Sequence, residues 1–385
     1  MDRYSSEQMA RDIASEVAGI KVNMSQLNMM VIGKTGTGKS TLINGMFGED
    51  LARTGTGFPV TMEVGSYSKN NYPFIIMDWP GFELEGDKSI NVQFEDIKKV
   101  ISLGNKSKKP QNMIHCILYC VSATSHRFEE AEIDFVRKLL AETGRYKIPV
   151  ILVITQAFMK KDTQLLKESI EESELAFSDV VPVLVQDVDL EDYIKKAYGL
   201  DRLAAAISRV ISDDLKNTLE CVQQVNIRMM TRRAVMYVNG FATKAGALGL
   251  KPIFRKIDIY PIIVSTLANI SAVYDIGISQ EFIEAVSALI EDSEEVEIRQ
   301  NKILKVVRFL EPTVYLANSA YVGVQAGAVI TSLGQVFIKY MNLISSKEMS
   351  AEELDPKALV NEFNERFATA MRRNRHRRIW GNERK

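Results

Sequence analysis

The most constraining feature of this sequence is a glycine-rich segment between an apolar run and an amphipathic one. Residues 33–40 read Gly-Lys-Thr-Gly-Thr-Gly-Lys-Ser and fit the pattern G-x-x-x-x-G-K-[ST]. Residues 27–32 predict a buried strand before it, and residues 40–47 predict a helix after it. The glycines let successive backbone N–H groups point at a phosphate beside the positive end of the helix dipole. We call residues 33–40 the phosphate loop.

Two side chains of the phosphate loop have specific predicted roles. Lys39 is expected to bring a positive charge to the β- and γ-phosphates of a nucleotide, and Ser40 to ligate Mg²⁺. Lys34 is a second cation, for which two interpretations stay open: a solvated lysine, or a group that reaches the nucleotide of a partner. The other residues expected to contact the nucleotide here are Gly33, Lys34, Thr35, Gly36, Thr37, Gly38 and Thr41.

A second motif follows 39 residues after Lys39, where the apolar residues 74–77 end in Asp78-Trp79-Pro80-Gly81. This D-x-x-G stands at the end of a predicted strand. Asp78 is expected to hold the Mg²⁺ shell through water, and Gly81 to offer its backbone N–H to the γ-phosphate. Loss of that phosphate would then release the loop that follows, as in a two-state switch.

A segment rich in threonine and glycine, residues 53–61, lies between the two motifs. One of its threonines is expected to reach the metal with its hydroxyl and the γ-phosphate with its N–H. We favour Thr61 and keep Thr56 as the alternative. The predicted catalytic residues are therefore Lys39, Thr61 and Gly81, and the predicted metal ligands are Ser40, Thr61 and Asp78.

The first half of the chain alternates short apolar runs with amphipathic stretches, which predicts βαβ units around a mostly parallel sheet. Residues 61–68 and 73–79 read as a hairpin, and further strands are expected over 113–121, 149–155 and 180–185. Helices are expected over residues 5–22, 40–47, 128–142, 163–176 and 201–211. Beyond about residue 215 helical patterns dominate, so the expected domains are an N-terminal helix (1–24), an α/β domain (25–215) and an all-α domain with a basic tail (216–385).

Composition narrows the setting of the chain. Its 385 residues carry 48 basic and 49 acidic side chains, so no global field steers it onto a polyanion. Three cysteines are too few for a disulfide scaffold, which favours a reducing cytosol. Cys116 and Cys120 share one side of a predicted strand too far apart to bridge, so both are expected in the core.

Taken together, the phosphate loop, Thr61, Asp78 to Gly81 and the segment Gly199-Leu200-Asp201-Arg202-Leu203 resemble the G domain of Era-like and immunity-related, translation-factor-type GTPases. The resemblance covers about residues 25–215. It implies an α/β P-loop G domain that binds GTP or GDP with Mg²⁺, hydrolyses GTP to GDP and phosphate, and switches between two states. Residues 238–242, 248–253 and 326–334 resemble, more loosely, a hydrophobic helical domain of unknown function that follows the G domain in some bacterial GTPases.

Two positions depart from that family. Where its base-reading signature N/T-K-x-D is expected, the chain has Thr155-Gln156-Ala157-Phe158, so Thr155 and Gln156 are the matching nucleotide contacts and the aspartate is missing. Asp162 could replace it only if the loop folds back. Phe82 stands where regulatory GTPases have a glutamine that orients the attacking water, so either intrinsic hydrolysis is slow or another group positions that water.

The second half contains uncharged stretches at 259–274 and 312–338, the latter with a Gly323/Gly327 pair suited to close helix contact. Residues 312–338 are long enough to span a bilayer, but their polar residues also suit a buried helix of a soluble bundle. Residues 372–385 hold seven basic side chains, which could contact RNA or anionic lipid, form a solvated tail or pair with acidic residues 291–297.

The sequence therefore predicts a cytoplasmic, Mg²⁺-dependent GTPase whose nucleotide state switches a C-terminal helical domain. Two alternatives stay open: a membrane-associated, dynamin-like or immunity-related-type GTPase that self-assembles, and a nucleotide-binding scaffold with degenerate base specificity. The expected partners are the nucleotide, a second copy that pairs through the G domain, an anionic membrane or RNA at the basic tail, and an effector protein that the sequence does not identify.

Overall fold

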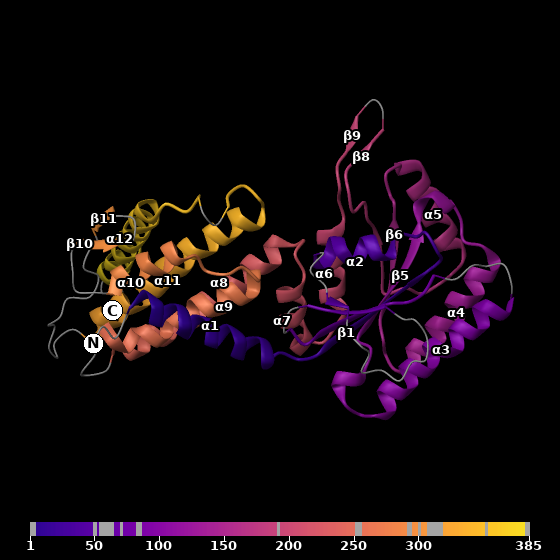
Figure 1. Cartoon of the computed structure of the whole chain (residues 1–385), viewed down its shortest axis with the longest axis horizontal. Helices are drawn as coiled ribbons and strands as arrows, with labels where there is room; N and C mark the ends of the chain where they lie inside the picture. Colours follow the sequence, from indigo (N-terminus) through magenta and orange to yellow (C-terminus); the bar gives the residue numbers. More distant parts are fainter. Residues whose placement is uncertain are drawn as a thin grey trace. The chain divides into compact units, whose positions relative to one another are not determined.

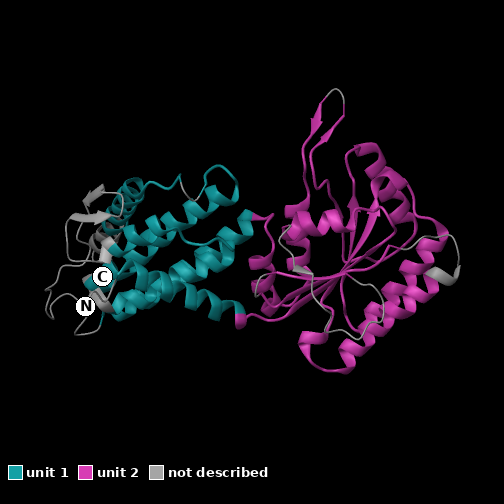
Figure 2. Ribbon diagram, viewed as in Figure 1, with its two compact units in different colours: residues 1–21, 227–385 teal, residues 22–226 magenta. Residues whose placement is uncertain are grey.

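The chain folds into two compact units (Figure 1), seen here in a computed structural model. Figure 2 colours them separately: residues 22–226, which we call the α/β unit, and residues 1–21 with 227–385, which we call the helical unit. The structure describes residues 5–48, 52–53, 65–69, 72–81, 87–190, 193–250, 256–290, 295–298, 302–305, 319–350 and 353–381.

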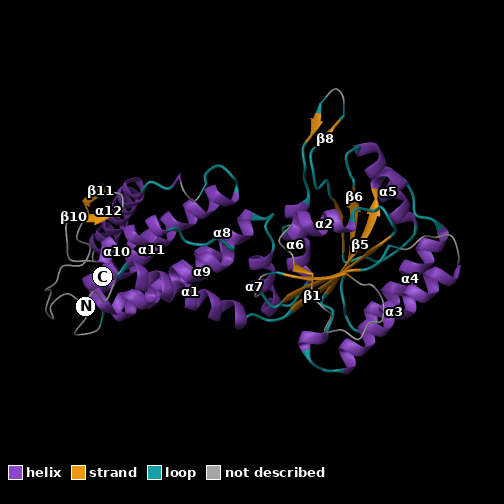
Figure 3. Ribbon diagram, viewed as in Figure 1, coloured by secondary structure: helices purple, strands orange, loops and turns teal. Residues whose placement is uncertain are grey.

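A seven-stranded sheet forms the centre of the α/β unit (Figure 3). Its spatial order is β2-β3-β4-β1-β5-β6-β7, antiparallel from β2 to β4 and parallel elsewhere. All seven residues of β1 and of β5 are buried, as expected for parallel strands covered on both faces. The strands are β1 Leu27–Gly33, β2 Ala52–Arg53, β3 Gly65–Ser68, β4 Phe74–Asp78, β5 Cys116–Ser122, β6 Val150–Thr155 and β7 Asp179–Pro182.

Helices cover this sheet, which confirms the predicted mostly parallel α/β fold. Side chains of α3, α4 and α5 share one apolar core cluster with the strands, while α2 packs against α6. The helices are α2 Lys39–Phe47, α3 Asp87–Lys106, α4 Glu130–Arg145, α5 Lys160–Glu172, α6 Leu200–Val210 and α7 Asp213–Val222, with 3-10 turns η1 Pro110–Asn112 and η2 Ala123–Ser125 and a small hairpin of β8 Val188–Asp189 and β9 Ile194–Lys195. The sequence analysis did not predict α3 and α7.

Helix α7 belongs to the α/β unit, although a domain division was expected near residue 215. Thr218 Oγ1 donates a hydrogen bond to the Ser25 carbonyl at 2.7 Å, and Lys69 Nζ donates one to the Val222 carbonyl at 3.0 Å. Leu215, Leu219 and Val222 are buried on the same helix. These contacts extend the compact unit to residue 226.

The helical unit gathers segments from both ends of the chain. Its elements are α1 Ser6–Val22, α8 Ile227–Leu248, η3 Lys256–Ile259, α9 Tyr260–Tyr274, α10 Gln280–Ile290, β10 Glu295–Ile298, β11 Lys302–Lys305, α11 Ser319–Ser345 and α12 Pro356–Gly381. Tyr260 Oη donates to Asp12 Oδ2 at 2.6 Å, and Lys21 Nζ lies 3.0 Å from Asp275 Oδ1. Helix α1, expected as a separate segment, therefore packs within this unit. The β10–β11 hairpin adds two short antiparallel strands to an expected all-α domain.

Helix α11 crosses the helical unit. Within the part of the chain that the structure describes, residues Val322–Ser345 form one helix long and apolar enough to span a membrane, but 61% of its apolar window is buried inside the protein. The predicted close contact is present, because a Cβ atom on Gly323 would lie 2.7 Å from the Gly246 carbonyl oxygen of α8. Both features suit a core helix.

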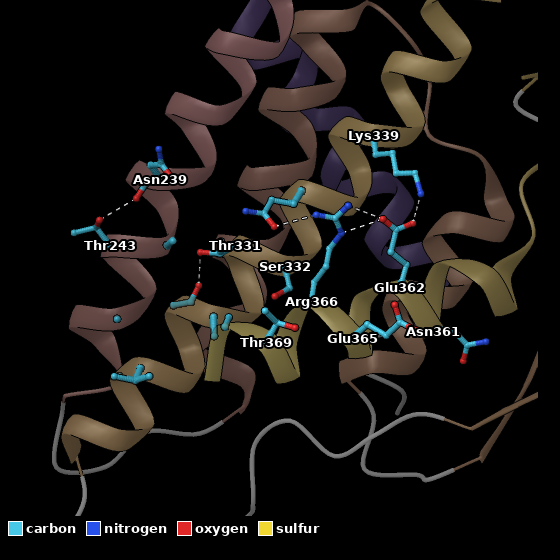
Figure 4. A pocket seen from close by; sticks show the side chains of 18 of the residues that line it. Asn239, Thr243, Thr331, Ser332, Lys339, Asn361, Glu362, Glu365, Arg366 and Thr369 are labelled. Atoms are coloured by element: carbon cyan, nitrogen blue, oxygen red, sulfur yellow. Dashed lines mark hydrogen bonds and ion pairs between the residues drawn. The ribbon is translucent and has the colours of Figure 1, made fainter. Parts of the chain in front are cut away.

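Helices α8, α11 and α12 frame a groove of about 1470 Å³ (Figure 4). Glu362 of α12 organises one part of its lining: Lys339 Nζ lies 2.7 Å from Glu362 Oε2, and Arg366 Nη2 lies 2.6 Å from Oε1. Arg366 Nη1 also donates to Gln335 Oε1 at 3.2 Å. Lys339–Glu362 and Arg366–Gln335 thus link α11 with α12, and Glu362–Arg366 is an ion pair within α12.

Replacement of Gly323 should destabilise the helical unit. We expect Gly323→Val to lower the free energy of unfolding by about 1–3 kcal/mol, because the new side chain must push α8 and α11 apart. The matched control is Gly240→Ala, since Gly240 lies on α8 with no atom near its added Cβ and should gain up to about 1 kcal/mol. Urea unfolding followed by circular dichroism measures both. Equal stability of the two variants would contradict the close contact.

Candidate nucleotide-binding site

Four parallel strands deliver the candidate residues to one edge of the sheet. Val31 pairs with Asp78, Gly33 with Cys120, and Ser122 with Thr155, so the carboxyl ends of β4, β1, β5 and β6 lie in register. Ligands of open α/β sheets bind at such an edge. The phosphate loop, Asp78 and Thr155, which are far apart in sequence, are brought together here.

The phosphate loop has the strand–loop–helix context that its sequence predicts. It follows β1 and leads into α2, with Gly38 as the N-cap residue. Gly36 and Gly38 have φ angles of 79° and 77°, which side-chain-bearing residues rarely adopt. Thr37 is nearly buried and donates from Oγ1 to the Lys34 carbonyl at 2.9 Å, which holds the turn closed. Thr41 lies exposed in the first turn of α2.

Lys39 folds back over the loop. Its Nζ donates to the carbonyl oxygens of Gly33 at 3.0 Å and Lys34 at 2.9 Å, and only 8% of the residue is exposed. Burial lowers the pKa of Lys39, and the nearby Asp78 carboxylate opposes that shift. An ammonium held by two carbonyls in a desolvated place can exchange these neutral acceptors for phosphate oxygens, which are stronger acceptors.

Ser40 and Asp78 form a second polar pair. Ser40 Oγ donates to Asp78 Oδ2 at 2.8 Å, whereas Asp78 Oδ1 is buried and has no hydrogen-bond partner among the described residues. Burial raises the pKa of Asp78, while the Ser40 hydrogen bond and Lys39 act in the opposite direction. A buried carboxylate oxygen without a donor, beside a hydroxyl, suits a hydrated divalent cation. The residues present therefore fit Mg²⁺.

Gly81 lies directly against the phosphate loop. A Cβ atom on Gly81 would stand 2.6 Å from Thr35 Oγ1 and 2.7 Å from the Thr35 backbone nitrogen. Any side chain at this position would therefore displace one of the two segments.

Thr56, Thr61 and Phe82, which the sequence analysis singled out, lie outside the described residues.

Thr155 and Gln156 hydrogen-bond to backbone carbonyls of the phosphate loop. Thr155 Oγ1 is buried and donates to the Thr37 carbonyl at 2.6 Å, and Gln156 Nε2 donates to the Gly36 carbonyl at 3.3 Å. Ser122 Oγ donates to Gln156 Oε1 at 2.5 Å. Both ends of the Gln156 amide are thus engaged by protein. Sequence reasoning missed Ser122, whose only signal was its place at the end of a predicted strand.

Two charged side chains have partners that the sequence did not reveal. Lys34 Nζ lies 2.8 Å from Glu132 Oε2 of α4, and the Lys34 side chain is 19% exposed, so it is not a solvated lysine. Asp162, considered as a substitute for the missing base-reading residue, pairs with His126 at 3.1 Å. Nothing in the local sequence pattern connects Lys34 with Glu132, which is 98 residues away.

The cysteines pack in the core, as predicted. Cys116 and Cys120 are buried and unbridged, and burial raises the pKa of each to about 12. Neither is a thiolate near neutral pH, so thiolate chemistry does not contribute to this site.

Residues 28–156, a third of the chain, match the family model described as "50S ribosome-binding GTPase". This segment is a GTPase G domain. It contains β1, the phosphate loop, Asp78, Gly81 and Thr155.

Among curated proteins, the chain is similar to neuronal-specific septin-3 of Danio rerio, with 29% identity over 187 residues, 43% of this chain and 51% of the relative. It is also similar to neuronal-specific septin-3 of Homo sapiens, with 26% identity and coverage of 43% and 52%. The chain thus spans about half the length of the curated relatives it matches.

Two solved structures show similarity at the level of the fold. Era in complex with MgGDPNP and nucleotides 1506–1542 of 16S ribosomal RNA has 18% identity and a TM-score of 0.34, covering 56% of this chain and 68% of that chain. The G domain of the T. maritima FeoB iron transporter has 16% identity and a TM-score of 0.31, covering 48% and 98%.

Asp78 should cost the folded protein stability. Because its pKa is raised, the folded state favours the protonated carboxyl, and stability is lost as the pH rises through the folded pKa. Asp78→Asn should therefore raise the melting temperature without added nucleotide, by more at about pH 8 than at about pH 5. Differential scanning fluorimetry measures this.

The matched control for that experiment is Asp187→Asn. Hydrogen bonds from Lys196 and the Ala197 N–H lower the pKa of the exposed Asp187, so removal of its charge should not stabilise the protein. A lower melting temperature for Asp78→Asn than for the parent protein at both pH values would contradict the assignment.

Proposed function

We propose that this protein is a Mg²⁺-dependent GTPase in which the α/β unit binds and hydrolyses GTP and the bound nucleotide controls the helical unit. One observation carries the proposal. The phosphate loop, the Ser40–Asp78 pair and Gly81 lie at one edge of the sheet, with a buried carboxylate oxygen of Asp78 lacking a donor among the described residues. A structural turn would not need that arrangement.

The side chains of the site divide the work of phosphate recognition. N–H groups of the phosphate loop and the Lys39 ammonium would stabilise negative charge on the transferring phosphoryl group as water attacks the γ-phosphorus and GDP leaves. The backbone N–H of Gly81 would sense the γ-phosphate from its place against Thr35. Release of phosphate would then free the segment after Gly81, which leads into α3.

Mg²⁺ would be held by Ser40 and Asp78, with Thr61 as the third proposed contact. When bound, the ion would neutralise charge on the phosphates. In this structure the same two residues already hydrogen-bond each other at 2.8 Å. Binding of the cation would use the free Oδ1 of Asp78 and relieve the cost of burying that carboxylate.

Degenerate base specificity is a second candidate, favoured by the contacts of Thr155 and Gln156. Both side chains hydrogen-bond to phosphate-loop carbonyls, and Asp162 is paired with His126. The hydrogen bonds and the ion pair of Thr155, Gln156 and Asp162 are therefore made with protein groups, which leaves none of the three assigned to hydrogen-bond a guanine base. We keep GTP as the proposed substrate because the matched G domain favours it.

The helical unit is the proposed output of the switch, in the cytosol. The burial of most of the apolar window of α11 supports a role as a core helix rather than a membrane span. Helix α12 continues to Gly381, so the basic residues 372–378 lie on helix. A continuous basic helix could contact an anionic surface such as a membrane or RNA.

Lys39→Ala should abolish nucleotide binding, because it removes the only side-chain cation of the described loop that bonds to loop carbonyls. Isothermal titration calorimetry with GTP and with ATP measures affinity, and a phosphate-release assay with both nucleotides measures turnover. Lys109→Ala, an exposed lysine beside η1, is the control and should bind as the parent does. Unchanged GTP affinity in Lys39→Ala would overturn the proposal. Turnover of ATP by the parent protein equal to that of GTP would overturn the proposed base preference.

The two candidate switch threonines can be separated directly. Thr61→Ala should lower kcat for GTP by about 100-fold, because it removes a proposed metal contact and a group near the γ-phosphate. Thr56→Ala should change kcat by less than about threefold. Phosphate release at saturating Mg²⁺ measures both variants. The reverse order of effects would move the assignment to Thr56.

A further inference from the structure

A buried carboxylate beside the phosphate loop is not used by the proposed chemistry. The Glu132 side chain on α4 is 1% exposed, and its Oε2 lies 2.8 Å from Lys34 Nζ. The nearby Glu129 lies farther from the ammonium, at 3.5 Å, and its side chain is 56% exposed. The close, desolvated interaction is therefore that of Lys34 with Glu132.

The second oxygen of Glu132 is also held. Tyr119 of β5 donates from Oη to Glu132 Oε1 at 3.0 Å, and the Tyr119 ring stacks on Phe128 with ring centroids 6.5 Å apart. Burial raises the pKa of Glu132, whereas Lys34 and the Tyr119 hydrogen bond favour its charged form. A buried ion pair of this kind adds little to stability compared with apolar side chains of similar size. Its geometry therefore calls for another explanation.

The backbone of Lys34 supplies that explanation. The Lys34 carbonyl accepts hydrogen bonds from Lys39 Nζ and from Thr37 Oγ1, each at 2.9 Å. The next residue, Thr35, lies against Gly81. Lys34 therefore contacts Glu132 of α4 through its side chain and Lys39 through its carbonyl. We call the Lys34–Glu132 ion pair, with the Tyr119 hydrogen bond, the tether.

The tether also reaches the helix that follows the D-x-x-G segment. On α4, one turn after Glu132, Phe135 packs edge-on against Phe94 of α3 with ring centroids 6.3 Å apart. Helix α3 begins at Asp87, shortly after Gly81. Glu132 therefore lies where a shift of α4 would be passed to the phosphate loop.

We propose that Glu132, held by Tyr119, is a positioning residue that fixes Lys34 and through it the phosphate loop in its nucleotide-binding conformation. This inference rests on the proposed GTPase function. Loss of the tether leaves Lys39 and the loop N–H groups available to stabilise the transferring phosphoryl group but loosens the loop that carries them, so binding of GTP and of its transition state should weaken equally. Such a loss of uniform binding raises KM and leaves kcat nearly unchanged.

Paired replacement of both charges provides the decisive variant. Lys34→Met with Glu132→Met removes the tether without leaving an unpaired buried charge, so the fold should persist, with a melting temperature lowered only by the loss of the acceptor for the Tyr119 hydroxyl. KM for GTP should rise about tenfold while kcat changes by less than about threefold. Tyr119→Phe should raise KM by about threefold, because it removes one donor to Glu132. Glu130→Gln, an exposed acidic residue in the same turn of α4, is the matched control and should leave KM unchanged.

Hydrogen exchange without added nucleotide separates this inference from the proposed function. Backbone amides of residues 35–40 should exchange at least about fivefold faster in the paired variant than in the parent or in Glu130→Gln. Faster exchange supports the tether even if the parent protein does not turn over GTP, which would overturn only the proposed function. Unchanged exchange in the folded paired variant, or an unchanged KM in an active one, overturns the tether.

Discussion

Desolvated charge at the edge of a parallel sheet is the constraint on which this structure depends. Around the phosphate loop, Lys39 and Glu132 are buried, and Asp78 is half-buried with its Oδ1 shielded from water. A buried charge is tolerable only when it is paired or hydrogen-bonded. Lys39 meets that requirement through two loop carbonyls and Glu132 through Lys34 and Tyr119, whereas Asp78 retains one oxygen that no described residue satisfies.

This arrangement would preorganise the proposed site for a phosphate and a cation. In a low-dielectric setting, each incoming charge interacts more strongly with a preorganised partner than it would in water. The loop carbonyls that hold Lys39, the hydroxyl of Thr155 and the amide of Gln156 keep the loop backbone in place. The unsatisfied oxygen of Asp78 lowers the stability of the folded protein without Mg²⁺, and a bound Mg²⁺ would remove that cost.

How far the sequence predicts this structure depends on whether a signal is local. The phosphate loop, the hairpin that ends at Asp78 and the alternation of strands and helices follow from glycine spacing and apolar periodicity, and these were confirmed. Helix α3 was missed although the local signal was present, since its buried residues Ile90, Ile97 and Ile101 recur at helical spacing. The placement of α1 beside α9 was missed because Asp12 and Tyr260 lie 248 residues apart.

The sequence by itself predicted the chemistry that we propose: a glycine-rich loop with Lys39 for phosphate, Ser40 and Asp78 for Mg²⁺, and a G domain that contains them. Tertiary structure alone decided how these groups are held. Parallel strand pairing aligns the ends of β1, β4, β5 and β6. In the folded chain Glu132 pairs with Lys34, and Ser122 donates to Gln156. Packing also places α7 in the α/β unit. The physical reason is that periodicity records which face of an element is buried, whereas the partner across that face is fixed by packing.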